Sequence, residues 1–436
     1  MTTLLKLKKT IKKISPSFLI SWYHFLLAFL AAVIYSFPSY KKELKVIGVT
    51  GTNGKSTVVK MIAKILEEAG FLVAYSSSIK FKIREKETKN LLRMTMPGRF
   101  ALQKFLKQAL EAKCQYVVLE VTSEGIKQHR HRFINFDIAV FTNLTPEHIE
   151  SHGSFEKYRE AKGKLFKATK NIHILNLDDK NVEYFLQFPA EKKYGYSLEH
   201  DNPYSKLKGV EKIIASRCKS NINGVGFYVD NLEFKLQMLG DFNIYNALAA
   251  ICVGLSQGIN LGISKKALEK IEKVPGRMEL VISEPFMVVV DYAFTPNALE
   301  KVYQTLQKIK TTKGETKMIC VLGATGGGRD KWKRPVLGEI AEKYCDDVII
   351  TNEDPYDEDP MEIINQVAKG AGLKAKKILD RRQAIRTALE TAKKGDIVII
   401  TGKGSEPSMC IEEGKKIPWD DRKVVKEEFS QLALSN

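Results

Sequence analysis

The feature that most constrains the fold is a glycine loop between a predicted strand and a predicted helix. Residues 45–50 form a short β-branched run, KVIGVT, and the next four residues, GTNG, begin and end with glycine. The apolar residues after this loop recur at helical spacing, at Val58, Val59, Ile62, Ile65 and Leu66. A strand–loop–helix unit of this kind belongs to a sheet with helices packed on it, so we expect an α/β fold.

The same loop has the chemistry of a phosphate-binding site. Gly51 and Gly54 let backbone N–H groups approach phosphate oxygens, and the side chain of Lys55 can reach the terminal phosphates. Ser56 offers a hydroxyl to Mg²⁺ at the positive N-terminus of the helix. Val49 stands where the strict phosphate-loop pattern has its first glycine. The order of strand, Gly-Lys-Ser and helix nevertheless favours a nucleotide site over a chance glycine turn.

Further strand-like runs alternate with helical stretches such as 100–113. They lie at residues 71–76, 116–121, 136–141 and 173–177, and in a second series at 287–291, 318–322, 348–351 and 397–401. Such alternation predicts parallel sheets covered on both faces. We therefore expect a central, mostly parallel sheet domain of the P-loop type and a C-terminal Rossmann-like α/β domain.

Polar side chains cluster where two of these strands end. Glu120, Thr122 and Ser123 follow one strand. Asn143, Thr145 and His148 follow the next. Open α/β sheets bind their ligands at the carboxyl ends of their strands, and a carboxylate and an imidazole beside a phosphate loop can hold the metal ions of a nucleotide.

The N-terminal segment, residues 1–43, is basic and apolar. The chain has 69 Lys and Arg against 51 Asp and Glu, a net charge of +18, and Glu43 is its first acidic residue. Lysines at positions 6, 8, 9, 12, 13, 41 and 42 flank the apolar stretch Ser17–Phe37. Excess positive charge suits nucleic acid, an anionic membrane or a phosphorylated substrate.

Several interpretations of this segment compete. The apolar stretch is long for a signal peptide, and no A-x-A-like cleavage site precedes Pro38. A single span would leave the lysine-rich N-terminus outside, against the positive-inside tendency. We expect a helix in the interface of the membrane, or a hairpin dipping into it, at the inner face of the plasma membrane. The alternative is a hydrophobic helix packed on the protein's own body or on a partner.

Two other classes of protein are disfavoured. The six cysteines form no CxxC pair, which favours reduced, buried thiols in a cytoplasmic protein over a zinc module or a disulfide framework. Nucleic-acid binding has only the charge in its favour, because no helix-turn-helix, zinc finger or RNP-like motif accompanies it. We expect no nucleic-acid partner.

From Lys45 to the C-terminus the motifs resemble those of the Mur ligases, the ATP-dependent amide-bond-forming family of peptidoglycan synthesis. GTNGKST resembles the family's phosphate loop, and QHR, FTNLTPEHIESHG and YREAKGKLF follow in the family's order at 128–130, 141–153 and 158–166. LGDFNIYNALAA at 239–250 resembles its adenine-side motif, and VPGRME at 274–279 its junction with the last domain. DYAFTPNALE, GGGRDKWKRP and GKGSE are most similar to the MurE type, which adds the third amino acid to UDP-N-acetylmuramoyl-dipeptide.

The resemblance implies a domain organisation and a set of site residues. Residues 44–273 would form the ATP-binding domain and residues 274–436 the C-terminal domain. ATP would be bound by Gly51, Thr52, Asn53, Gly54, Lys55, Ser56, Thr57, Asn243, Asn246, Asp291, Arg329 and Lys333. Two Mg²⁺ ions would be held by Ser56, Glu120, His148 and Lys162, the last as a carbamate, and Lys55, Lys162 and His148 would be catalytic. The muramoyl-peptide acceptor and the free amino acid would be bound by Thr95, Thr122, Ser123, Arg130, Asp354, Tyr356, Gly402 and Glu406.

Departures from the family pattern bear on the substrates. The DNPR box reads Glu353-Asp354-Pro355-Tyr356, and a tyrosine cannot form the bidentate pair of arginine with a carboxylate. Because Asp354 also adds an acid, we expect lysine or ornithine in preference to diaminopimelate. Only residues 1–43 stand where the family has a uridine-binding domain. We expect an acceptor bound through its sugar and peptide alone, a UDP-linked acceptor held differently, or a lipid-linked one. Phe294 and Glu124 replace two family histidines.

The implied mechanism has two steps, formation of an acyl phosphate from ATP and its capture by an amine. One alternative is a folylpolyglutamate-synthase-like ligase, which shares the phosphate loop and the chemistry. Another is a catalytically inactive, membrane-associated nucleotide-binding protein. The DYAxTP and GKGxE runs favour the Mur family over the first. Against the second, Lys55, Ser56, Glu120, His148 and Lys162 are all present together.

Overall fold

The computed structural model describes residues 16–90, 94–199, 202–272, 274–311 and 316–435. They form two compact units that interleave along the sequence. The first, here the central unit, comprises the described residues up to Leu144, then Arg159–Ile214 and Ala247–Ala267. The second, here the C-terminal unit, comprises Thr145–Tyr158, Ala215–Asn246 and the described residues from Leu268 onward.

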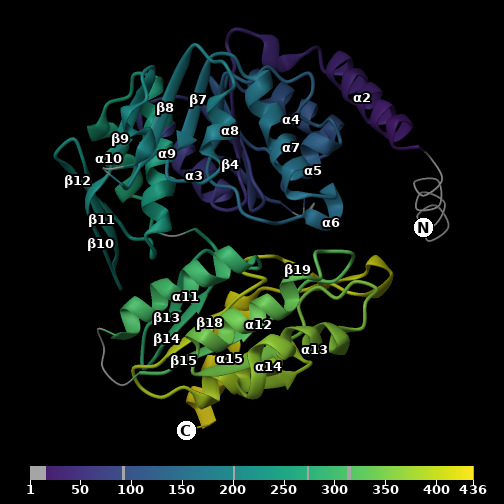
Figure 1. Ribbon diagram of the computed structural model, residues 1–436, viewed down its shortest axis with the longest axis vertical. Helices are drawn as coiled ribbons and strands as arrows, with labels where there is room; N and C mark the ends of the chain where they lie inside the picture. Colours follow the sequence, from purple (N-terminus) through teal and green to yellow (C-terminus); the bar gives the residue numbers. More distant parts are fainter. Residues whose placement is uncertain (1–15, 91–93, 200–201, 273, 312–315, 436) are drawn as a thin grey trace. The chain divides into compact units, whose positions relative to one another are not determined.

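A nine-stranded sheet with the strand order β4-β3-β2-β5-β1-β6-β7-β8-β9 organises the central unit (Figure 1). Its strands are β1 (Lys45–Thr50), β2 (Val73–Ser76), β3 (Lys80–Ile83), β4 (Lys86–Lys89), β5 (Tyr116–Glu120), β6 (Ile138–Phe141), β7 (Ile172–Asn176), β8 (Lys192–Ser197) and β9 (Val210–Ile214). All pairs are parallel except the two made by β3, so the expected mostly parallel sheet is confirmed. The four strands predicted here are present as β2, β5, β6 and β7, with ends shifted by up to two residues.

Strand β1 lies at the centre of this sheet, between β5 and β6. Val49 is level with Glu120 on one side and with Val140 on the other. The chain leaves β1 for β2 on one side and later returns to β6 on the opposite side, which makes the carboxyl end of β1 a switch point. Ligands of open α/β sheets bind at such points.

Helices cover both faces of the sheet. They are α3 (Lys55–Glu68), α4 (Arg99–Glu111), α5 (Ser123–Lys127), α7 (Phe155–Ala168), α8 (Val182–Leu186), α9 (Phe242–Ser256) and α10 (Leu261–Glu269). The short helix α6 (Ile149–His152) belongs to the segment that clusters with the C-terminal unit. Every residue of β5 and of β6 is buried, as expected for strands covered on both sides. The helix predicted at 100–113 is α4.

The N-terminal apolar stretch forms helix α2 (Ser17–Ile34), which lies against α4 at one edge of the central unit (Figure 1). Its small residues Ala28, Ala31 and Ala32 are buried, so the predicted packing on the protein's own body is confirmed for one face. The lysines at positions 6 to 13, which were expected to contact the membrane surface, lie outside the described residues. Among the residues that the structure describes, no helix is long and apolar enough to span a bilayer.

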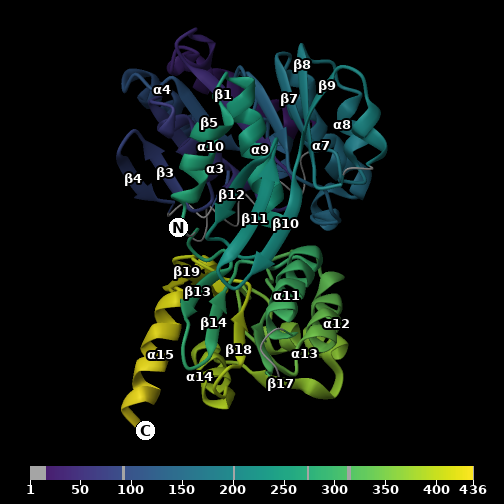
Figure 2. The same cartoon turned by 90° about the vertical axis from the view of Figure 1, so that its left-hand side faces the viewer.

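A six-stranded sheet organises the C-terminal unit, in the order β13-β14-β18-β15-β16-β17 (Figure 2). Its strands are β13 (Glu279–Ile282), β14 (Met287–Val290), β15 (Met318–Leu322), β16 (Asp347–Thr351), β17 (Ala375–Ile378) and β18 (Ile397–Ile400). Its helices are α11 (Pro296–Thr311), α12 (Lys333–Tyr344), α13 (Pro360–Ala371), α14 (Arg381–Thr391) and α15 (Asp421–Ser435). Alternate residues of the strands enter two separate hydrophobic cores. Val289 and Ile399 lie in one core, and Val288 and Val398 lie in the other. The expected doubly covered Rossmann-like sheet is confirmed.

Some elements had no counterpart in the sequence predictions. They are the β3–β4 hairpin, the strands β8, β9, β13 and β17, the antiparallel sheet of β10 (Ser216–Asn221), β11 (Gly224–Val229) and β12 (Leu232–Leu236), and the pair β19 (Ser408–Cys410) and β20 (Lys416–Pro418). All six cysteines are free thiols, as predicted, but Cys218 on β10 is exposed and not buried. It lies on β10, all of whose residues after Ser216 are exposed.

Candidate functional site

The loop after β1 can approach a phosphate because it has no side chains in the way. Gly51 has φ +151° and Gly54 has φ +84°, both in the region that favours glycine. A Cβ atom at Gly51 would lie 1.9 Å from Oγ1 of Thr142. Helix α3 begins at Lys55 directly after Gly54, so its free N–H groups and positive end face the loop.

Two lysine ammonium groups meet at this loop. Lys55 Nζ donates to the carbonyl oxygens of Gly51, at 3.1 Å, and Thr52, at 2.9 Å. Lys162 Nζ, from α7, donates to the same Gly51 oxygen at 2.7 Å. The Lys162 side chain is almost completely buried, and burial together with the charge of Lys55 holds its pKa well below the ordinary lysine value. The loop therefore concentrates positive charge and one amine that gives up its proton readily.

A hydroxyl and a carboxylate meet on the other side of Lys55. Ser56 Oγ lies 3.0 Å from each carboxylate oxygen of Glu120, at the end of β5. The backbone N–H of Ser78 donates to the same carboxylate at 2.5 Å. Hydroxyl and carboxylate oxygens are the hard ligands that Mg²⁺ prefers, so the residues present fit this ion.

The donor set is small, as a nucleotide-bound Mg²⁺ requires. Among the described residues, no group of three or more His, Cys, Asp or Glu side chains is arranged to hold a metal ion. Mg²⁺ in nucleotide sites keeps several waters and phosphate oxygens and takes only one or two carboxylates from the protein.

The strand next to β1 braces the phosphate loop. Asn143 Oδ1 accepts from the N–H of Asn53 at 3.0 Å, and Thr142 Oγ1 donates to the carbonyl of Asn53 at 2.7 Å. Thr142 and Ser78 were missed by the sequence analysis. Thr142 follows β6 and Ser78 comes shortly after β2. Their position at the carboxyl edge of the sheet, where ligands bind, could have identified them as site residues.

The residues expected to bind the acceptor gather around α5. Thr122 caps this helix by accepting from the N–H of Gly125 at 3.0 Å, and Ser123 is buried. Arg130 donates to the backbone oxygen of Met96, next to Thr95, and at 2.7 Å to Oε1 of Gln128. The structure therefore brings the 95–96 loop and the QHR segment together. Glu124, which replaces a family histidine, accepts from Gln128 Nε2 at 2.7 Å.

Arg130 lies in a cationic environment. Burial and the nearby Arg99 lower its pKa, while Glu124 raises it. The Nε atoms of both Arg99 and Arg130 are buried without a hydrogen-bond partner among the described residues. Such unpaired donors suit an anionic group of a ligand.

His148 belongs to the segment 145–158, which clusters with the C-terminal unit. Its φ of +58° is the left-handed conformation, directly before α6, and its ring lies 5.9 Å from that of Tyr158. In the same unit, Asn246 donates to Asn243 at 2.9 Å, and Asn243 donates to the carbonyl of Leu239 at 2.7 Å. These two amides, expected at an adenine, order one another at the start of α9.

Asp291 and Lys333 are both buried and already engaged. Asp291 accepts from the N–H groups of Met278, at 2.6 Å, and Ala293, at 2.7 Å, and burial raises its pKa. Lys333 Nζ lies 2.8 Å from Oε1 of Glu147 and 5.0 Å from the ring centre of Phe294. Phe294 thus has a clear contact, a cation–π interaction with the ammonium of Lys333.

Arg329 is the exposed member of the expected nucleotide set. It lies in the glycine loop between β15 and α12, next to the buried Asp330. Asp330 accepts from the N–H groups of Ile149, at 3.2 Å, and Glu150, at 3.0 Å. The carboxylate of Asp330 thus holds the base of the loop while Arg329 stays accessible.

The residues expected at the amino acid surround a buried lysine that sequence analysis missed. Lys403, the lysine of GKGSE, contacts both oxygens of Asp354 at 2.9 Å and Glu406 at 2.5 Å. Tyr292 donates to Glu406 at 2.8 Å. Asp354, the acid that replaces an asparagine of the family pattern, is therefore already paired with a lysine of the protein.

Gly402 and Tyr356 complete this cluster. Gly402 has φ +106°, and a Cβ atom there would lie 2.2 Å from Oε2 of Glu353. Tyr356 has the left-handed backbone conformation. Burial raises the pKa of its phenol to about 12. The phenol is neutral at physiological pH, so it offers a hydrogen bond but no charge.

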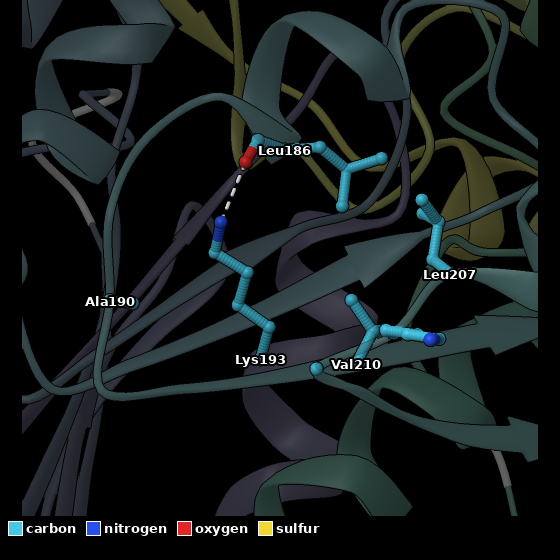
Figure 3. A pocket seen from close by; sticks show the side chains of 7 residues that line it. Leu186, Ala190, Lys193, Leu207 and Val210 are labelled. Atoms are coloured by element: carbon cyan, nitrogen blue, oxygen red, sulfur yellow. Dashed lines mark hydrogen bonds between the residues drawn. The ribbon is translucent and has the colours of Figure 1, made fainter.

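A pocket elsewhere in the central unit does not belong to this site. Figure 3 shows it between Leu186 at the end of α8 and the first residues of β8 and β9, with Lys193 Nζ donating to the Leu186 carbonyl at 2.6 Å. It lies at the amino ends of parallel strands, whereas the phosphate loop lies at the carboxyl end of β1. Ligand sites of such sheets lie at the carboxyl edge.

Comparison with known proteins agrees with this geometry. Residues 49–254 match the Mur ligase middle domain, and residues 276–404 match the Mur ligase glutamate ligase domain. The UDP-N-acetylmuramoyl-L-alanyl-D-glutamate–2,6-diaminopimelate ligase of Syntrophomonas wolfei is 38% identical over 414 residues, which cover 92% of this chain and 81% of the relative. A UDP-N-acetylmuramyl-tripeptide synthetase of Roseiflexus is 36% identical, with 93% and 82% covered.

Solved structures give the same result at the level of the fold. A UDP-N-acetylmuramoyl-L-alanyl-D-glutamate–2,6-diaminopimelate ligase superimposes with a TM-score of 0.60 and 29% identity, over 90% of this chain and 79% of that one. A bifunctional folylpolyglutamate synthase/dihydrofolate synthase has a TM-score of 0.64 at 18% identity, over 86% of this chain and 90% of that one, and shares the fold alone. By the matched domains and the identity to its relatives, the chain belongs to the Mur ligase family.

Proposed function

We propose that this protein is an ATP-dependent ligase that joins an amino acid to the carboxylate of a muramoyl-peptide precursor of peptidoglycan. The single observation that carries the proposal is the phosphate loop with Lys55 and Lys162 on one side and the Ser56–Glu120 pair on the other. The names of the relatives support the class of substrate. In this proposal, residues 44–273 bind ATP and residues 274–436 form the second catalytic domain.

In the first step, a carboxylate oxygen of the acceptor attacks the γ-phosphorus of ATP, which gives an acyl phosphate and ADP. Lys55 and the loop N–H groups from Gly51 to Thr57 neutralise the charge on the transferring oxygens. Arg130, with Thr95, Thr122 and Ser123 near it, orients the acceptor. The other proposed nucleotide-binding residues are Asn243, Asn246, Asp291, Arg329 and Lys333.

In the second step, the amine of the incoming amino acid attacks the acyl carbon. The tetrahedral intermediate expels inorganic phosphate, the amine loses a proton, and an amide remains. Gly402, Glu406 and the Asp354–Tyr356 segment line the amino-acid side in this proposal. The Lys403 ammonium holds Glu406 and Asp354 in place.

Ser56 and Glu120 are the proposed ligands of one Mg²⁺ ion, with His148 at a second. Bound Mg²⁺ would neutralise phosphate charge and so assist attack by the acceptor. Lys162 is the proposed site of a carbamate, which forms when a neutral amine adds CO2 and releases a proton. Its lowered pKa supports this, because the neutral amine is the reactive form, and a carbamate supplies the oxygens that Mg²⁺ prefers.

For the amino acid we propose lysine or ornithine in preference to diaminopimelate. The support is Tyr356, which stands where the family has an arginine and whose phenol stays neutral. The relative from Syntrophomonas wolfei is named as a diaminopimelate ligase, which favours the opposite choice, whereas the name of the Roseiflexus relative specifies no amino acid. An ADP-release assay with ATP, UDP-muramoyl-dipeptide and each amino acid decides between them.

In this assay we expect turnover with lysine or ornithine to exceed that with diaminopimelate by about tenfold, the value of one charge-assisted pair. Tyr356→Arg should move the preference toward diaminopimelate, while Tyr356→Phe should leave it unchanged. A clear preference of the wild-type protein for diaminopimelate would refute the amino-acid assignment. Turnover only with a folate acceptor, or none with any acceptor, would refute the proposed function.

We also propose that residues 1–43 bring the enzyme to the inner face of the plasma membrane. The lysines of this segment and its apolar stretch support the assignment. A lipid-linked acceptor, compared with the UDP-linked one in the same ADP-release assay, tests its consequence for the substrate.

A further inference from the structure

Helix α2 has its polarity reversed relative to an ordinary surface helix. Its large apolar side chains point outward, with exposed fractions of 66% at Phe18 and 63% at Trp22. The exposed large side chains of α2 are Phe18, Leu19, Trp22, Tyr23, Leu26, Phe29, Leu30, Val33 and Ile34. They recur every three or four residues and form one continuous stripe, here the outer stripe of α2. A stripe of this length on one element is more than the scattered exposed side chains of a normal surface.

The opposite face of α2 is fastened to the central unit. Ser21 Oγ lies 2.8 Å from Nε2 of His129, and Arg99 lies 2.9 Å from Nδ1 of His24. The ring of Phe25 lies 5.2 Å from that of Phe133. Because polar and aromatic contacts fix the inner face, a simple rotation of the helix cannot bury the outer stripe.

The charges around the helix identify what covers the outer stripe. No acidic residue occurs before Glu43, and lysines stand on both sides of α2 in the sequence. Lys41 and Lys42 are exposed after its C-terminal end, and Arg132 is exposed close to His129, whose pKa it helps to lower. A helix with large apolar side chains on one face, aromatic residues among them and exposed cations after its C-terminal end suits an anionic lipid surface.

We infer that the outer stripe of α2 is a docking surface for an anionic lipid bilayer, with the helix lying in the plane of the interface. The apolar side chains enter the acyl boundary, and the exposed Lys41 and Lys42 contact the lipid phosphates. Trp22 and Tyr23 have the amphipathic rings that concentrate at this depth. The competing occupant is a second copy of the chain. The charge argument does not support it, because packing two such helices together would bring their positive charges close to one another.

The docking has a consequence for the substrate, which rests on the proposed function. Arg99 and His129 are the hydrogen-bond partners of α2. Arg99 is close in sequence to Thr95, and His129 directly precedes Arg130, and both Thr95 and Arg130 are proposed to bind the acceptor. A bilayer bound by α2 would therefore lie beside the acceptor-binding segments of the central unit. An acceptor attached to a membrane lipid would be presented there.

The inference is tested by sedimenting the full chain with vesicles, without ATP. We expect about tenfold more binding to phosphatidylcholine vesicles containing roughly one third phosphatidylglycerol than to phosphatidylcholine alone, and less at high salt. Trp22→Asp/Leu30→Asp should abolish binding. The matched control, Ile222→Asp/Leu373→Asp, changes two exposed apolar residues outside α2 and should bind as the wild type.

Two further readouts keep the test decisive. Wild-type fluorescence minus that of Trp22→Phe should show a blue shift of Trp22 upon vesicle addition, and the melting temperatures of all variants should agree because the changed side chains are exposed. Absence of vesicle binding would overturn the inference, as would equal loss in the control. A wild-type dimer that the Trp22→Asp/Leu30→Asp variant converts to a monomer would also overturn it. None of these outcomes depends on ligase activity, so failure of the proposed function is seen separately.

Discussion

Lys162 in the central unit and Lys403 in the C-terminal unit are both almost fully buried, but their surroundings are opposite. Lys162 Nζ donates to the carbonyl oxygen of Gly51. Its pKa is strongly lowered because the side chain is buried and lies near the positive charge of Lys55. Lys403 lies between the carboxylates of Asp354 and Glu406, at 2.9 and 2.5 Å. The charged form of the first amine is disfavoured, whereas the second amine has two carboxylates as hydrogen-bond partners.

This difference separates a reactive position from a positioning one. A buried amine whose charged form is disfavoured is available as a base, as a nucleophile toward CO2, or as a partner for an added anion. A buried ammonium between two carboxylates is satisfied by the protein itself, and its removal leaves uncompensated charges. We therefore expect loss of Lys162 to affect turnover and loss of Lys403 to affect stability.

The largest expected effect is on turnover by Lys162→Met. ADP release should fall about 10³-fold, because an electrostatic contribution at the phosphate loop is lost. The melting temperature should not fall, since an apolar side chain of similar length replaces a costly buried amine. Lys162→Glu, which supplies negative oxygens in place of those of the proposed carbamate, should regain part of the activity.

The control for this change is Lys164→Met, at an exposed lysine on the same helix. It should leave ADP release unchanged. Removal of bicarbonate and CO2 from the assay should lower wild-type activity, and added bicarbonate should restore it, if Lys162 carries a carbamate. Equal activity in Lys162→Met and wild type would remove the contrast between the two lysines.

The next largest effect is on the stability of Lys403→Met. Breaking this pair leaves Asp354 and Glu406 without their counter-charge, which should cost roughly 3 kcal/mol in chemical denaturation. Adding Asp354→Asn should recover at least part of the loss, because the amide oxygen can still accept from the N–H of Cys410. A single variant as stable as the wild type would show that the pair is not structural.

The smallest expected effect is the pH dependence of stability caused by a buried histidine of the central unit. His131 is buried in the central unit, and burial, assisted by Arg132, lowers its pKa to about 3. Between pH 6.5 and 3 the unfolded histidine binds a proton and the folded one does not, so stability falls as the pH falls. From pH 7 to pH 5 the expected loss is about 2 kcal/mol.

Denaturation at the two pH values tests this sign. His131→Gln removes the titrating ring and should reduce the dependence on pH by about that amount. His173→Gln should act in the same direction, because burial lowers the pKa of His173 to about 4. An unchanged slope in both variants would contradict a proton-linked cost in the central unit.

Much of the fold was predictable because it depends on local patterns. The β-branched run and glycine loop at 45–54 specify the β1–α3 unit, and alternating strands and helices specify parallel sheets. The β3–β4 hairpin and the β10–β12 sheet were not predicted. Their strands are short and largely polar, as in KETK and SRCKSN, so they lack the apolar periodicity that marks a strand.

The phosphate loop and Glu120 were also predictable, because a motif and a strand end mark them. The roles of Asp354 and Lys403 were not. The sequence shows an acid in place of an asparagine but does not show that Lys403, 49 positions later, pairs with it. This contact depends on the tertiary structure, which brings the loop after β16 and the loop after β18 together.

The sequence by itself determined the α/β class, the phosphate loop, the family and the basic, apolar composition of the N-terminal segment. These follow from residue order over a few turns or a single motif. Only the tertiary structure decided which buried charges are paired, and which face of α2 lies outward. Burial and long-range pairing set the protonation of Lys162 and the partners of Lys403, and neither can be read from neighbouring residues.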